Sequence, residues 1–76
     1  MELKEFIRNF ADQFDDTPAS EFTKDTVFHD LDEYSSLIAL SIISMVDDEY
    51  GVTLSGNEMK AAVTIGDLFN TVEAKI

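Results

Sequence analysis

The chain has 76 residues, of which 45% are apolar and six are Phe, enough for one small hydrophobic core and no second domain. Its 16 acidic and 5 basic residues give a formal net charge of −11. That balance argues against nucleic acid and anionic membrane surfaces, because both are bound chiefly through Lys and Arg. No cysteine is present, which excludes disulfides and a thiolate nucleophile.

The N-terminus is charged, and no stretch approaches the ~20 apolar residues of a membrane span. We therefore expect a single domain over residues 1–76, cytoplasmic and without a membrane span. The charge is unevenly distributed, because no Lys or Arg lies between Lys24 and Lys60. The acidic residues of that stretch predict a negative field that steers basic partner surfaces toward it.

Apolar residues recur at three- and four-residue steps from Leu3 to Phe14, which predicts a helix over about residues 2–15. Pro18 then disfavours helical geometry at Thr17. A long connection follows, from Pro18 to Ser35. We expect four apolar side chains to attach this connection to the core: Phe22, Val27, Phe28 and Leu31.

A second helix is predicted over residues 36–50, and it is apolar nearly all the way round. At ~100° per residue, its buried face should comprise Ile38, Ala39, Ile42, Ile43, Met45, Val46 and Tyr50. Ser41, Ser44 and Asp48 take the opposite face, and Leu37 falls among them. We therefore expect Leu37 to be exposed beside Ser36.

Three local signals organise the rest of the chain. Gly51 suits the position that ends the second helix. Ser55 and Glu58 have the spacing of a capping box, which opens a short helix. Thr64 should cap the last helix, with Asp67 in its first turn. The predicted fold is all-α: a small bundle of three main helices plus one short helix, with a long loop between helix one and helix two.

Other chemistry finds little support in the sequence. Asp30-x-Asp32 resembles the start of a calcium loop, but the loop's required Gly and Glu are here Ser35 and Ser41. The only histidine, His29, is better explained as a loop residue at the surface than as part of a catalytic triad. No Gly-rich phosphate loop and no metal-ligand spacing occurs, so we expect neither a metal site nor catalytic residues.

The start of the second helix is the strongest candidate site. Ser35 suits the N-cap, with its hydroxyl accepting a hydrogen bond from a backbone N–H one turn in. Ser36 would then be the first helical residue, where the helix dipole and free N–H groups favour a phosphate. On physical grounds alone, a double-serine cap without chemistry explains the pair equally well.

The chain resembles an acyl carrier protein over nearly its whole length. That family has three main helices, a short extra one, a long first loop and an Asp-Ser-Leu signature at the start of helix two. Ser35-Ser36-Leu37 occupies this place, preceded by Asp30-Leu31 and followed by Asp47-Asp48-Glu49-Tyr50. Residues 63–68 also resemble the family's entry into its last helix. Ser35 replaces the usual Asp, and Leu37 favours Ser36 over Ser35 as the equivalent of the modified serine.

The resemblance implies a non-enzymatic carrier with 4′-phosphopantetheine, donated by coenzyme A, on Ser36; Ser35 is the second choice for attachment. The cargo would be an acyl or related carboxylic group held as a thioester. The pathway stays open among fatty acid, polyketide, peptide and cell-envelope lipid synthesis. Expected partners are a phosphopantetheinyl transferase and acyl-transferring, synthase or ligase enzymes with basic docking surfaces. The carrier itself is expected to be a monomer.

The partner surface should lie around the second helix. Its predicted members are Asp32, Glu33, Leu37, Ile38, Ser41, Met45, Asp47 and Asp48. Where relatives place acids along the first turns of this helix, the chain has Ile38, Ser41 and Ser44, which predicts a less acidic and more apolar surface. The alternative, from another class, is an unmodified acidic helical module that binds a basic protein through the same face.

Overall fold

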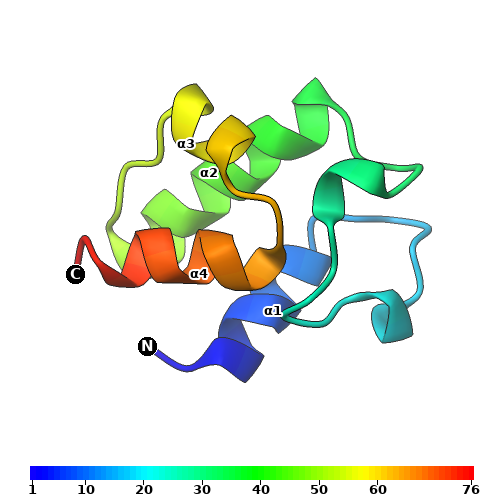
Figure 1. The fold of residues 1–76 in the computed structure, drawn as a ribbon, viewed down its shortest axis with the longest axis horizontal. Coiled ribbons are helices and arrows are strands. Elements are labelled where there is room, and N and C mark those ends of the chain that lie inside the picture. Colours follow the sequence, from blue (N-terminus) through cyan, green and yellow to red (C-terminus); the bar gives the residue numbers. More distant parts are fainter.

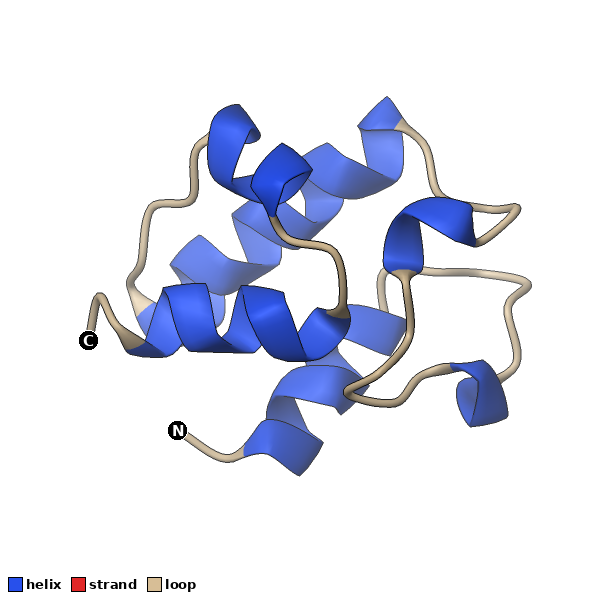
Figure 2. Ribbon diagram, in the orientation of Figure 1, coloured by secondary structure: helices blue, strands red, loops and turns tan.

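A computed structural model describes all 76 residues, and it consists of helices joined by loops (Figure 1 and Figure 2). The four α-helices are α1 (Leu3–Ala11), α2 (Ser36–Tyr50), α3 (Gly56–Ala61) and α4 (Ile65–Glu73). Two short 3-10 turns, η1 (Ala19–Glu21) and η2 (Phe28–Asp30), lie between α1 and α2. The predicted all-α bundle of three main helices and one short helix is confirmed. None of the helices has the length and apolar content needed to cross a membrane.

Fifteen buried residues form one core, and all of them are hydrophobic. Phe10 of α1 lies at its centre, with ring centroids 5.6 Å from Phe14, 6.2 Å from Phe22 and 5.4 Å from Phe28. These contacts join α1 to the long connection, as the apolar pattern predicted. Val27 is the exception among the expected anchors, because its side chain is 38% exposed.

Helix α1 ends four residues earlier than the predicted residue 15. Asp12 closes the helix, and the chain then tightens, with the N–H of Gln13 bonding Phe10 O and the N–H of Phe14 bonding Ala11 O. This tightening leaves Phe14 in the core, 7% exposed. The apolar stripe therefore continues beyond the helix, which is why the periodicity overestimated its length.

The connection from α1 to α2 is tied to the start of α4. The N–H of Ile65 donates to Thr26 O over 3.1 Å, and the N–H of Gly66 donates to Lys24 O over 2.9 Å. A Cβ added at Gly66 would lie 2.9 Å from Lys24 O, so glycine is required for this close approach. These bonds hold the long loop against the bundle, on the side of Figure 1 away from both chain termini.

The predicted end of α2 and the predicted starts of α3 and α4 are confirmed. Gly51 ends α2 in a left-handed conformation with φ 66°, a geometry that glycine adopts without steric cost. Ser55 and Glu58 form a complete capping box at α3. Thr64 and Asp67 form another at α4. These signals could be identified because each depends on residues within one turn.

Candidate functional site

The two adjacent serines at the start of α2 have different surroundings. Ser35 is the N-cap, and its Oγ accepts a hydrogen bond of 3.2 Å from the backbone N–H of Ile38. Ser36 is the first helical residue; its side chain is exposed, and its hydroxyl has no hydrogen-bond partner in the protein. Only Ser36 therefore presents a free hydroxyl at this helix start.

The first turn of α2 suits a negatively charged group. The N–H groups of Ser36 and Leu37 have no partner within the helix, as at every helix start. The positive end of the helix dipole also lies here, and it stabilises an exposed anion by ~0.3–1 kcal/mol. No acidic residue occupies this first turn, so no side chain in the turn would repel a phosphate attached to Ser36.

A groove of about 400 Å³ begins at Ser36 and runs between α2 and α3. Three of its lining residues, Ala39, Leu40 and Ile43, belong to α2 and lie on the same side of that helix as Ser36. Its complete lining is His29, Tyr34, Ser36, Ala39, Leu40, Ile43, Gly56, Met59 and Lys60. No acidic side chain belongs to this set. The site thus combines a free hydroxyl with a mostly apolar groove and one lysine.

His29 and Tyr34 form the wall of the groove that the long loop contributes. The Nε2 atom of His29 lies 3.1 Å from Met59 O and 3.0 Å from Ala62 O. Both are acceptors, so this nitrogen donates, and the histidine fastens η2 to the end of α3. The rings of His29 and Tyr34 meet edge-on at 5.0 Å. Burial raises the pKa of the Tyr34 phenol.

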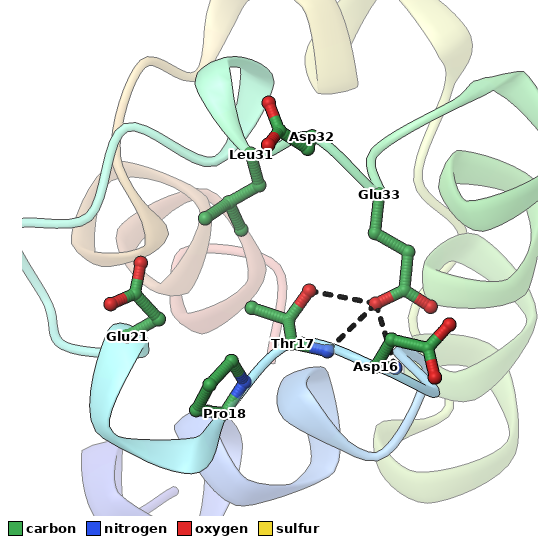
Figure 3. Close-up of a pocket in the computed structure, with 7 residues that line it drawn as sticks. All are labelled: Asp16, Thr17, Pro18, Glu21, Leu31, Asp32 and Glu33. Carbon is green, nitrogen blue, oxygen red and sulfur yellow. Dashed lines mark hydrogen bonds between the residues drawn. The ribbon is translucent and has the colours of Figure 1, made fainter.

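Glu33 fastens the other end of the loop to the residues that follow α1 (Figure 3). Its carboxylate accepts hydrogen bonds from the backbone N–H of Asp15, Asp16 and Thr17, at 2.6 Å, 3.0 Å and 3.0 Å. The hydroxyl of Thr17 donates a fourth, at 2.7 Å. The Thr17 hydroxyl, followed by the Asp15 N–H, holds the pKa of this carboxyl below its usual value. We name this arrangement, Glu33 with the N–H groups of residues 15–17, the Glu33 clamp.

A hollow of about 420 Å³ lies beside the Glu33 clamp. Asp16, Glu21 and Asp32 are at its edge with Glu33, and Figure 3 shows the Glu33 carboxylate directed toward the backbone of residues 16 and 17. No group of three or more His, Asp or Glu side chains is arranged to hold a metal ion. The hollow is thus a polar surface feature separate from the groove beside Ser36.

The residues predicted to meet partners differ in exposure, and one of them, Met45, is buried. Leu37 is 73% exposed, and Asp32, Asp47 and Asp48 are also exposed. Ile38 and Ser41 are half-buried, and the half-buried Glu33 is engaged in its clamp.

Met45 requires a correction. Its side chain is 7% exposed and belongs to the core, so it offers little surface to a partner. The ~100° spacing of helical residues had already placed Met45 on the buried face of α2, and the structure agrees with that prediction and not with the partner-facing one.

The sequence reasoning did not identify the groove or its lysine. A usable signal existed within α2, because Ala39, Leu40 and Ile43 lie three, four and seven residues after Ser36 and so share its side of the helix. Leu40 is also 62% exposed, a second apolar surface residue beside Leu37. The contribution of α3 could not be seen in the same way, since it depends on how α3 is placed against α2.

Comparison with known families gives one result. The model of a family described as phosphopantetheine attachment site matches residues 5–72. The matched range includes all of the residues at the start of α2 and every residue of the groove. Neither a comparison with curated proteins nor one with solved structures gives a match.

Proposed function

We propose that this chain, which belongs to the phosphopantetheine-attachment-site family, carries an acyl or related carboxylic group as a thioester on an arm attached to Ser36. Membership of the family makes the chain a carrier that bears 4′-phosphopantetheine, and not an enzyme. The acyl cargo, its delivery to partner enzymes and the attachment residue are the proposed parts. Its cytoplasmic location, its monomeric state and its organisation as a single domain stay predictions.

The observation that supports Ser36 is its free hydroxyl. Ser35 uses its Oγ to cap α2, whereas Ser36 is exposed at the same helix start without an internal partner. The residues present fit the prosthetic group, because a phosphate on Ser36 meets free N–H groups, no acidic residue in the first turn of α2 and a groove that could receive the rest of the arm. The arm also supplies the thiol that this cysteine-free chain lacks.

The loading reaction balances with coenzyme A as donor. The hydroxyl oxygen of Ser36 forms a new bond to phosphorus, and the pyrophosphate bond of coenzyme A breaks. The nucleotide half leaves with the bridging oxygen, and the serine proton passes to a base of the transferase. The chain's own part is to present the hydroxyl on a rigid helix end.

The proposed partner surface is the exposed side of α2. Carriers of this family interact with transferases and synthases. Here Leu37 and Leu40, 73% and 62% exposed, would supply apolar contact close to Ser36. Asp47 and Asp48, exposed at the far end of α2, would attract basic groups on the partner. This arrangement places the apolar contact near the arm and the charges more than two helical turns away.

The test is enzymatic loading followed by intact mass measurement. Apo protein is incubated with coenzyme A, magnesium and a phosphopantetheinyl transferase of broad specificity. We expect the mass of one phosphopantetheine group to be added to the wild type and to Ser35→Ala, and none to be added to Ser36→Ala.

Two other outcomes have different meanings. Loading that survives in Ser36→Ala but disappears in Ser35→Ala would move the site by one residue. Absence of loading with several transferases would contradict the proposal and leave an unmodified acidic interaction module as the better explanation.

A further inference from the structure

Lys60 is the one Lys or Arg side chain that lines the groove beginning at Ser36. It lies in the last turn of α3 and is exposed. No other lining residue is Lys, Arg, Asp or Glu, and the Nε2 of His29 is engaged by the carbonyl oxygens of Met59 and Ala62. The Lys60 ammonium is therefore the principal positive charge facing this groove.

This ammonium has no internal ion pair, although the chain carries a formal net charge of −11. The two ion pairs of the structure join Lys24 to Asp25 and Lys75 to Glu58, at 3.2 Å and 2.8 Å. The groove has no acidic side chain, so it is an uncompensated cationic site on an acidic protein. Such a site complements an anion brought to it from outside the polypeptide.

We propose that Lys60 pairs with the phosphodiester that joins the prosthetic arm to Ser36, and thereby directs the arm along the groove between α2 and α3. The inference rests on the proposed attachment at Ser36. A lysine suits this task, because its flexible stem and compact charge need no fixed approach to a phosphate oxygen. Beyond the phosphate, the arm would lie over Leu40 and Ile43, where its methyl groups meet apolar surface; Met59 also lines the groove but is only 2% exposed.

The experiment compares apo and holo protein by NMR. Shifts of the side-chain methyl groups of Leu40, Ile43 and Met59, and of the arm's ³¹P resonance, are recorded for wild type, Lys60→Gln, Lys60→Arg and the control Lys24→Gln. Lys24 is exposed and lies outside the groove, so its variant removes an equal charge elsewhere. Intact mass first verifies that each sample carries the arm.

In the wild type we expect loading to shift the three groove methyl groups. In Lys60→Gln these apo-to-holo differences should fall to about half or less, because an exposed ion pair changes populations by a factor of a few. Lys60→Arg and Lys24→Gln should keep them. Added salt of about 1 M should reduce the wild-type differences in the same way, since it shortens the Debye length to ~3 Å.

Several results would overturn the proposal. They are unshifted groove methyl groups in the loaded wild type, equal differences in Lys60→Gln, or an equal loss in Lys24→Gln. The apo spectra outside the groove report whether Lys60→Gln is folded, and Lys60→Arg supplies a second folded variant. A chain that takes up no arm fails at the mass measurement, which separates failure of the carrier function from failure of the Lys60 contact.

Discussion

Two neighbouring residues of the same type serve different purposes at the start of α2. Ser35 stabilises the helix through its bond to the Ile38 N–H, whereas the Ser36 side chain is exposed, as the proposed attachment of the arm requires. The distinction depends on one position along the helix axis. A cap must precede the first helical residue, whereas a side chain at the first helical position points away from the N–H groups it would have to satisfy.

This division predicts unequal effects of two alanine substitutions on stability. Ser35→Ala should lower the free energy of unfolding by about 1 kcal/mol, a typical cost for a lost N-cap. Ser36→Ala should change it by less than about 0.5 kcal/mol, because no internal hydrogen bond is removed. Urea unfolding of the two apo variants gives both values. Equal destabilisation by the two substitutions would contradict the assignment of Ser35 as the cap.

At the residue level the sequence was informative where interactions are local. The caps at Ser35, Ser55 and Thr64 and the end of α2 at Gly51 were all predicted, since each needs only residues within a turn. The partner-facing role of Met45 was not correct, and Lys60 was missed. The ~100° spacing had placed Met45 on the buried face of α2, so that error was avoidable. The position of Lys60 depends on how α3 packs against α2, about which periodicity carries no information.

At the level of elements, the Glu33 clamp determines how the long connection leaves α1. It satisfies three backbone N–H groups directly after the helix, where the chain turns away instead of continuing as helix. The sequence offered no signal for it, because Glu33 lies 16 to 18 residues from its partners. Glu33 is also close in sequence to Ser36, so the clamp helps to position the start of α2.

The clamp predicts a stability contribution that depends on pH. The pKa of Glu33 in the folded protein lies below the unfolded value of about 4.5. Its contribution is therefore fully present above about pH 4.5 and is lost as the pH falls through the lower, folded-state pKa. Glu33→Gln should be less stable than wild type at pH 7, and the difference should shrink below about pH 4.5.

Urea unfolding at a series of pH values measures that difference. Asp32→Asn is the matched control, because Asp32 precedes Glu33 directly and its exposed carboxylate takes no part in the Glu33 clamp. A gap between wild type and Glu33→Gln that stays constant down to pH 3 would rule out the ionised carboxylate as the source. Glu58, held by Lys75, and Asp67, held by the Thr64 N–H, also have lowered pKa values. Glu33→Gln removes none of their contacts, so their contributions should cancel in the comparison.

At the scale of the whole molecule, the excess of negative charge has two separate consequences. Self-repulsion destabilises the folded chain, while the same field would attract the basic partner surfaces proposed above. The structure has only two ion pairs, and the formal net charge of −11 leaves most acidic side chains without a basic partner. The core, by contrast, contains no buried polar or charged residue. The fold therefore depends on apolar packing, and charge acts mainly through the surface.

These two consequences predict that salt acts in opposite directions on stability and on loading. Raising NaCl from about 20 mM to about 500 mM shortens the Debye length from roughly 20 Å to about 4 Å. The urea midpoint of the apo protein should then rise, because self-repulsion is screened. The rate of loading by the transferase should fall, because attraction of its basic surface is screened as well.

Two variants separate charge attraction from apolar contact in the loading rate. The double substitution Asp47→Asn with Asp48→Asn should lower the rate a few-fold at low salt and flatten its salt dependence, since these carboxylates would guide the encounter. Leu37→Ser should lower the rate at every salt concentration without changing the slope, because it removes apolar contact next to Ser36. Identical salt slopes in wild type and the double variant would show that the far end of α2 does not face the transferase.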